Sequence, residues 1–333
     1  MADFTVRTFK LLLTTLKTQG FSFVSLNDFL SGSRGKTIFL RHDVDLSPIN
    51  SLEFAEIETE FGIKGTYYFR TIPGSWDEEV IRKIAGMGHE IGYHYEDVSL
   101  TAERLSAHGA GHRAQGRGHR GKDSKKYVVC SKDYEEFEKQ LVNITIESFS
   151  KNLEKLRKLV PIKTICMHGR PLSKWDSRLL WKYYDYQDYG ISGEPYFDIN
   201  FNEVLYLTDT GRRWDGDAVS VRDKALGVGR WASEENHYKD WKVKPINFRP
   251  DVDKISISPS PPLPLFPSSY MFHSTSDIIK AAGEKQLPDR IMMTFHPQRW
   301  TDKLGPWIKE LIWQNVKNIG KYFLVKMRSN SSS

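Results

Sequence analysis

Hydrophobic and polar residues follow one another along the chain as short apolar runs separated by amphipathic segments. The apolar runs indicate buried strands, and the segments between them carry apolar residues at the 3.6-residue spacing of helices. The expected strands occupy 37–40, 65–69, 89–94, 163–168 and 291–296. The expected helices occupy 4–16, 47–62, 137–156, 177–184 and 305–323, with a further helix after residue 75. Strands that alternate with helices predict parallel βαβ units.

Helix-start residues and chain length support further predictions about the helices and the number of domains. Ser47 is a suitable N-cap before Pro48, and Ser75 precedes an acidic turn that favours the positive end of a helix dipole. The number of strand–helix units predicts an α/β fold with a barrel-like arrangement. A length of 333 residues with 39% hydrophobic content suits one large domain over 1–333. Two segments fall outside the repeated unit, a basic Gly-rich loop at 108–127 and an irregular Pro-rich insert at 223–270.

Composition narrows the expected location and partners. Cys130 and Cys166 are too few for a disulfide framework, the first 20 residues lack the features of a signal peptide, and no apolar stretch is long enough for a membrane span. We therefore expect a soluble cytoplasmic protein without a membrane partner. Most of the net charge of +6 lies in 111–126, which has no aromatic residues to stack on bases. No nucleic-acid partner is expected.

Ionisable side chains stand at or just beyond the ends of the expected strands. In a parallel barrel these ends open on one face, where sites are built. The residues in these positions are His42, Asp43, Asp45, Arg70, His94, Glu96, Asp97, His168 and His296. Aspartates and neutral imidazoles that meet at one point favour a divalent metal, Zn²⁺ by default, although Fe, Co, Ni and Mn also suit such ligands. Metal binding lowers the pKa of water from about 15.7 to about 7, which suits amide or ester hydrolysis.

The segments RHDVD and GHEIGYH, followed by a late strand that ends in histidine, resemble the motifs of the polysaccharide deacetylase family of metal-dependent carbohydrate esterases. The resemblance spans most of residues 37–300, and CMHGRPLS, YLTDTGRRW and HPQRW are similar to one branch of that family. It implies a distorted (β/α) barrel of about seven parallel strands and N-deacetylation of a saccharide. It also implies that Asp43 is the catalytic base, that Asp45 and His94 bind the metal, and that His296 is the general acid.

One position departs from the pattern of that family. The second metal histidine of the family lies four residues after the first, and here the position is Val98, which cannot bind a metal. We expect His168 to replace it because His168 also ends a strand, and Glu96 and Asp97 are the alternatives. Two other histidines, His42 and His89, are expected to be structural.

The substrate is expected to be a small saccharide or saccharide precursor. The segments YDYQDYGISGEPYFD and YLTDTGRRWDG are rich in side chains that stack on sugar rings and bind hydroxyl or acidic groups. The expected substrate contacts are Arg70, Arg170, Asp209, Arg212, Arg213 and Trp214. Two alternatives stay open at this point. One is a metal-free saccharide-binding pseudoenzyme on the same barrel, and the other is a hydrolase of other non-peptide C–N bonds, such as formamides or cyclic amides.

Overall fold

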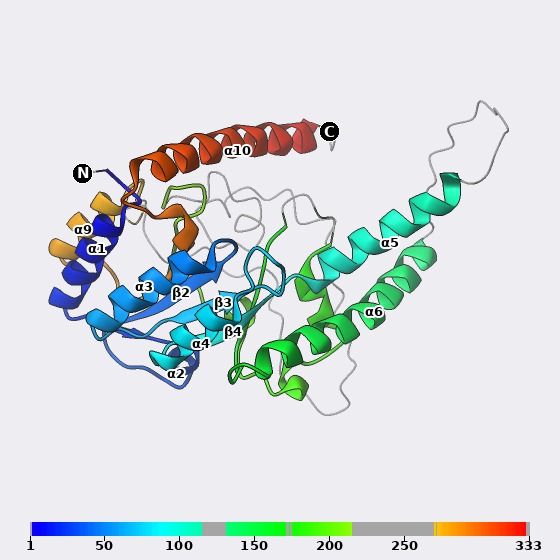
Figure 1. Ribbon diagram of the computed structural model, residues 1–333, viewed down its shortest axis with the longest axis horizontal. Helices are drawn as coiled ribbons and strands as arrows, with labels where there is room; N and C mark the ends of the chain where they lie inside the picture. Colours follow the sequence, from blue (N-terminus) through cyan, green and yellow to red (C-terminus); the bar gives the residue numbers. More distant parts are fainter. Residues whose placement is uncertain are drawn as a thin grey trace.

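The computed structural model describes residues 2–114, 131–170, 173, 175–214, 270 and 272–330. Figure 1 shows the arrangement of the elements. They are α1 (Val6–Thr18), β1 (Ser22–Val24), α2 (Leu26–Leu30), β2 (Thr37–Val44), α3 (Pro48–Glu60), β3 (Thr66–Phe69), α4 (Glu78–Gly86), β4 (Glu90–Tyr95), α5 (Asp97–Ala114), α6 (Ser131–Arg157), β5 (Ile165–Met167), η1 (Ser177–Lys182), η2 (Tyr186–Tyr189), α7 (Pro195–Asp198), β6 (Leu205–Thr208), α9 (Thr275–Gly283), β7 (Arg290–Phe295), η5 (Pro297–Arg299) and α10 (Leu304–Asn330).

The described strands form one parallel sheet that curls into a half-barrel. Six strands are hydrogen-bonded in the order β5-β4-β3-β2-β7-β6, and β1 pairs with β2. The central strand β2 is long enough to hold two neighbours on one edge, since Thr37–Phe39 pairs with β1 and Arg41–Val44 pairs with β3. The structure confirms the predicted α/β class and the parallel βαβ pattern. The sheet is an open half-barrel in the described part of the chain.

The two faces of the sheet bury different kinds of side chain. Successive side chains of a strand point to opposite faces, so each strand divides its residues between them. The face beneath the helices packs Leu40, Tyr67, Tyr93 and Phe295 into the main core. The inner face holds a smaller cluster with Phe39, Tyr68, Cys166 and Met292. Further along β2 the residues of the inner face are Arg41 and Asp43, so polar groups collect at the carboxyl end of the half-barrel.

His42 and His89 lie beneath helix α3 and are structural, as expected. The His42 ring is fully buried and stacks on Tyr67 with 4.1 Å between ring centroids, and its Nε2 lies 2.8 Å from Oε1 of Glu58. The Nδ1 of His89 accepts the amide hydrogen of Gly65 at 3.2 Å, and its Nε2 lies 3.1 Å from the carbonyl oxygen of Ala55. Both imidazoles therefore serve the packing of α3 on the sheet.

Several predicted boundaries are wrong. Helix α5 continues to Ala114, so residues 108–114 are helical rather than loop; 115–127 of the expected loop and 223–269 of the expected insert lie outside the described residues. Helix α4 is capped by Asp77, because the hydroxyl of Ser75 is bonded to the carbonyl of Val44 instead. Ser47 precedes α3 in the left-handed conformation, at a φ of 53°, without a side-chain cap. The expected helix over 177–184 is the shorter 3₁₀ helix η1.

The helices at the periphery differ in how they are attached to the sheet. Helices α1 and α9 pack against each other at one end of the sheet, whereas α5 and α6 form an antiparallel arm that extends away from it (Figure 1). Helix α10 runs along one side of the molecule (Figure 1). Of the helices in the described ranges, each is too short or too polar to traverse a bilayer.

We expect Gly92→Ala to destabilise the protein by about 1–3 kcal/mol, because a Cβ there would overpack the inner face. That atom would lie 2.3 Å from Cε1 of the buried Tyr68 and 3.1 Å from the carbonyl oxygen of Thr164. The matched control is Gly86→Ala in α4, where a Cβ meets nothing within 4 Å and a gain of about 0.4–1 kcal/mol is expected. Urea unfolding of both variants measures the difference, and equal stabilities would contradict this packing.

Candidate metal centre

Asp45, His94 and His168, called the ligand triad below, converge at the carboxyl end of the half-barrel. The Oδ1 of Asp45 lies 3.4 Å from Nε2 of His168 and 3.7 Å from Nε2 of His94. One ligand atom from each residue lies within 4.8 Å of the others. Ligand atoms about 2.1 Å from a tetrahedral zinc ion are roughly 3.4 Å apart, so the spacing is close to that of a bound ion. The structure thus brings His168, the expected replacement for the ligand missing at Val98, next to the other two expected ligands.

Hydrogen bonds fix which nitrogen of each imidazole faces the centre. The Nδ1 of His94 lies 2.8 Å from the carbonyl oxygen of Cys166, and since a carbonyl only accepts, this nitrogen carries the hydrogen. The Nδ1 of His168 donates in the same way to Oε2 of Glu96 at 3.2 Å. Burial lowers the pKa of His94 to about 3, so this ring is neutral near pH 7. Both Nε2 atoms are therefore oriented as metal ligands.

Glu96 is a partner of His168 rather than a ligand. Arg70 holds Oε1 of Glu96 with Nε at 2.7 Å and Nη2 at 2.5 Å. Burial raises the pKa of Glu96, but the hydrogen bond to His168 and the charges of His168 and Arg70 outweigh it and bring the pKa to about 2. Glu96 therefore stays ionised as the acceptor for His168, and the Glu96 alternative for the third ligand is not supported.

Asp97 is not a ligand either, because its oxygens are used in the contact between α5 and α6. It accepts hydrogen bonds from the hydroxyl of Tyr93 at 2.6 Å, from Nδ2 of Asn152 at 2.7 Å and from the hydroxyl of Ser148 at 3.0 Å. Burial raises its pKa. Asp97 thus belongs to the packing of the helical arm.

The environment of Asp45 fits a bound cation. Its Oδ1 is buried and has no hydrogen-bond partner, which is costly for a carboxylate oxygen unless another group satisfies it. Burial raises the pKa of Asp45, but His168, His296 and His94 together hold it at about 2. An ionised oxygen that lacks a donor and faces two imidazole nitrogens is the donor set that a divalent metal satisfies.

Asp43 stands beside the ligand triad and is held by Arg41, a residue that the sequence analysis did not select. The guanidinium binds the carboxylate through Nε–Oδ1 and Nη2–Oδ2 contacts of 2.7 Å each. Burial raises the pKa of Asp43, but Arg41, His94 and His296 hold it well below its usual range. Residues i and i+2 of a strand point to the same face, so the segment RHD already indicated that Arg41 could pair with Asp43.

A second group of possible metal ligands consists of Asp43, His94 and Cys166, all buried. Both oxygens of Asp43 are already engaged by Arg41, and His94 is shared with the ligand triad. The ligand triad is therefore the better supported centre.

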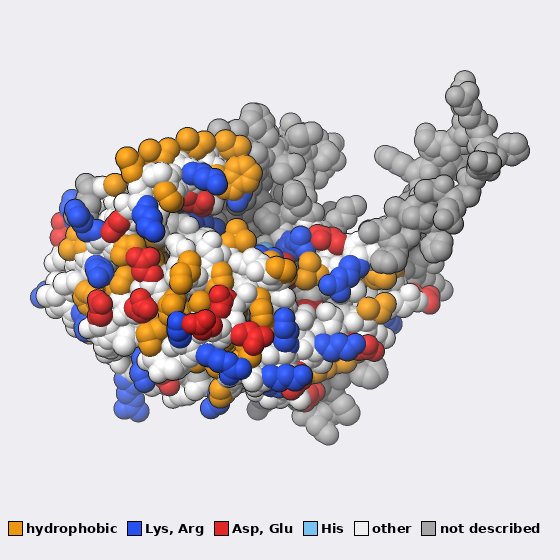
Figure 2. Space-filling view, in the orientation of Figure 1, with side chains coloured by type: hydrophobic (Ala, Val, Ile, Leu, Met, Phe, Trp, Pro, Cys, Tyr) orange, Lys and Arg blue, Asp and Glu red, His pale blue; other side chains and the backbone are white. Residues whose placement is uncertain are grey.

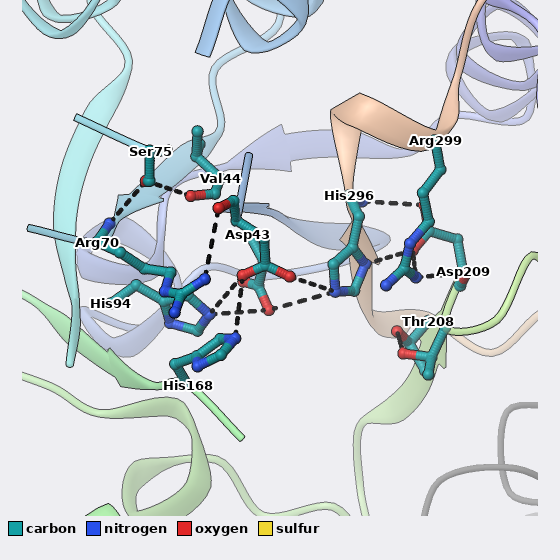
Figure 3. Close-up of polar contacts among 12 residues, drawn as sticks. Asp43, Val44, Arg70, Ser75, His94, His168, Thr208, Asp209, His296 and Arg299 are labelled. Carbon is teal, nitrogen blue, oxygen red and sulfur yellow. Dashed lines mark hydrogen bonds and ion pairs between the residues drawn. The ribbon is translucent and has the colours of Figure 1, made fainter. Parts of the chain in front are cut away.

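His296 lies across Asp43 from His94 and His168 (Figure 3). Its Nε2 is 4.0 Å from Oδ2 of Asp43 and 3.8 Å from Oδ2 of Asp45. On its other side, Nδ1 donates to Oδ1 of Asp209 at 2.5 Å, and Asp209 also accepts from Nε1 of Trp300 at 2.7 Å.

Asp209 is fully buried, so its expected role as a substrate contact is wrong and it orients His296. The missed strand β6 delivers it, and the apolar run LYLT before an aspartate was the available signal.

Two of the other expected substrate residues lie away from the centre. Trp214 is buried against Phe295 and donates through Nε1 to the hydroxyl of Thr275. Arg212 donates to the carbonyl oxygens of Trp307 and Asp3 and so ties the N-terminal segment to α10. These two expectations are wrong because both side chains are used in packing.

The remaining expected substrate residues are arginines. Arg70 and Arg170 both pair with Glu96, which contacts His168 of the ligand triad. Arg170 also pairs with Glu103 at 3.0 Å. Arg213 is half-buried and lies beside His273, with Nη2 3.4 Å from Nδ1. Only Arg70 and Arg170 are therefore placed to line an approach to the centre.

Comparison with protein-family models, with curated proteins and with solved structures finds no match to this chain. The fold and site themselves define the protein as a parallel half-barrel with buried aspartate and histidine groups able to hold a metal ion.

We expect purified protein to bind a divalent metal through the ligand triad. Glu96→Gln should weaken binding by about 10- to 100-fold, because the acceptor that orients His168 loses its charge. Asp45→Ala should abolish binding, whereas His273→Ala, at an exposed histidine, should leave it unchanged. Calorimetric titration of the metal-free protein with Zn²⁺ measures these affinities. Wild-type affinity in Asp45→Ala would contradict the assignment of the centre.

We also expect the stability of the metal-free protein to contain a component from His94 that decreases as pH falls below 6.5. The folded pKa is about 3 against an ordinary value of 6.5, so below pH 6.5 the unfolded chain binds a proton at this imidazole that the folded protein does not bind. The slope from this group is at most about 1.4 kcal/mol per pH unit. The difference in free energy of unfolding between wild type and His94→Gln, measured against pH, isolates it. A difference that does not change with pH would contradict the buried neutral imidazole.

Proposed function

We propose that the protein is a metal-dependent hydrolase that removes an N-acyl group, such as acetyl, from a saccharide or saccharide precursor, on a barrel of the polysaccharide deacetylase type. The observation that carries the proposal is the convergence of the ligand triad beside Asp43 and His296. The order of the motifs along the chain supports the same class. Hydrolysis is the reaction that a metal centre flanked by a carboxylate and an imidazole serves best.

The ligand triad would hold the metal, Zn²⁺ by default, which supplies an acidified water and polarises the acyl oxygen. Asp43 accepts the proton of the attacking water. Arg41 keeps the carboxylate ionised and fixes its direction, because it binds both oxygens. The same pairing lowers the basicity of Asp43, so the proposed proton transfer depends on the lowered pKa of the metal-activated water.

His296 protonates the departing nitrogen. Its Nδ1 hydrogen is bound to Asp209, so Nε2 is the atom that faces the centre and carries the proton to be transferred. Asp209 orients the ring by accepting the Nδ1 hydrogen of His296, and the bonds from Trp300 and Arg299 keep Asp209 in place. The base and the acid are thus neighbours, with 4.0 Å between Oδ2 of Asp43 and Nε2 of His296, and Asp43 lies between His296 and the two triad histidines (Figure 3).

The position of His168 favours a metal-competent hydrolase over a metal-free binding protein. The binding-protein alternative rested on Val98, and Val98 is a fully buried core residue. His168 supplies the third ligand atom in its stead, oriented by Glu96. A hydrolase of other C–N bonds would use the same centre, and release of formate instead of acetate in one assay distinguishes the two.

We expect Asp43→Asn to lower the turnover of the metal-loaded enzyme by about 10²- to 10⁴-fold with metal still bound, because one proton-transfer group is lost. The measurement is acetate and formate release from a panel of N-acylated sugars, together with metal content. Asp188→Asn, at an exposed aspartate of η2, is the matched control and should retain activity. Full turnover in Asp43→Asn, or no acyl release by metal-loaded wild type across the panel, would contradict the proposed function.

A further inference from the structure

The outward face of α10 exposes an unusual number of large apolar side chains. The exposed fractions are 71% for Leu304, 42% for Ile308, 59% for Ile312, 53% for Trp313 and 54% for Val316. No other helix or strand in the described ranges exposes more than two such side chains. Four of the five residues follow one another at intervals of four, so they share one side of the helix. Figure 2 shows the resulting apolar band along the edge of the molecule, and it is called the α10 band below.

The opposite side of α10 is the side that holds the helix on the body. The Nε1 of Trp307 donates to the carbonyl oxygen of Asp3 at 2.8 Å, and the carbonyl of Trp307 accepts from Arg212 at 3.1 Å. Gln314 is buried and donates to Glu310 at 2.6 Å. The α10 band is therefore directed outward by specific contacts, and contiguous exposed apolar surface of this kind marks an interaction site.

The charges near the α10 band are basic. Lys309 and Lys317 are exposed on the helix, Asp302 and Lys303 are exposed just before it, and Glu310 is half-buried on the attached side. In helical projection Lys309 falls between Val316 and Trp313, inside the band. In sequence, the remainder of the helix from 318 to 330 adds two lysines and one arginine and no acidic residue. Helices that combine a basic surface with Trp and Leu on an apolar side bind in the plane of the membrane interface.

The charge pattern also separates an anionic lipid surface from a second copy of the chain. Two copies that joined through the α10 band would bring the same lysines towards one another. Anionic headgroups would instead neutralise them, at about 1 kcal/mol for each Lys or Arg near the surface. Lysine stems can lie along the apolar surface while their ammonium groups reach the headgroups.

We propose that α10 is an interfacial membrane-binding helix whose apolar band inserts into a lipid surface that contains anionic headgroups. The helix lies on the surface and does not span it, so the proposal revises the sequence-based expectation of no membrane partner. This inference is independent of the proposed hydrolase function, since it concerns only α10 and its charges.

The test is co-sedimentation of the full-length protein with phosphatidylcholine vesicles, with and without a minority of phosphatidylserine. We expect binding to the phosphatidylserine vesicles that weakens as salt is raised. The double variant Ile308→Ser with Ile312→Ser should bind about tenfold or more weakly, because it removes apolar area from the α10 band. The matched control is Leu11→Ser with Phe197→Ser, which removes two exposed apolar side chains elsewhere and should bind as wild type.

A second variant, Lys309→Glu, leaves the apolar side chains in place and should lose the preference for phosphatidylserine. Circular dichroism verifies that each variant is folded. Absence of vesicle binding by wild type, equal binding by the Ile308/Ile312 variant, or equal binding to both vesicle types would overturn the proposal. A dimer in light scattering that the Ile308/Ile312 variant abolishes, without vesicle binding, would assign the α10 band to a second copy instead. Since no turnover is measured, these outcomes do not depend on whether the hydrolase proposal holds.

Discussion

Two carboxylates at the carboxyl end of β2 must be compensated inside the protein, and the arrangement of the centre follows from this requirement. A buried charge is tolerated only when it is paired or binds a metal. Asp43 is paired with Arg41 from the same strand. Asp45 has no such partner for Oδ1, and imidazoles from the ends of β4, β5 and β7 surround it. The difference between these two aspartates leaves Asp45 available to a metal ion and keeps Asp43 fixed and ionised.

Each histidine of the centre is oriented by an acceptor on its far side. The carbonyl of Cys166 fixes His94, Glu96 fixes His168, and Asp209 fixes His296. These acceptors are themselves held, by β-sheet hydrogen bonding in the first case and by arginine and tryptophan donors in the other two. Such outer contacts set the tautomer and direction of the rings before any ligand arrives, which is what a metal centre and an acid catalyst both require. The parallel half-barrel supplies the common edge at which they meet.

The two sides of the sheet separate the tasks of stability and chemistry. The helix-covered side is aromatic and aliphatic, and buried ionisable groups on it, among them His42, His89 and Glu58, serve packing. The inner side is apolar near the start of the strands and polar at their ends. Helix α10 adds a third surface, because it is held by its inner side and leaves apolar side chains outside. The proposed membrane contact therefore involves none of the side chains of the centre.

The sequence by itself determined the α/β class, the order of the main strands and the ionisable residues at their ends. Apolar runs and helical periodicity are local signals, and in a parallel sheet the end of every strand lies on one edge, so His168 could be selected from its position alone. Only the tertiary structure decided what each side chain contacts. Glu96 and Asp97 are neighbours in sequence, yet Glu96 orients a histidine of the centre and Asp97 joins two helices. Asp209, Arg212 and Trp214 looked alike as substrate contacts, but they are partners of residues distant along the chain, and no local pattern encodes that pairing. The strand β6 was missed although the local run LYLT indicated it, whereas Ser75 was mistaken for the cap of α4 because its hydroxyl is engaged by the distant carbonyl of Val44.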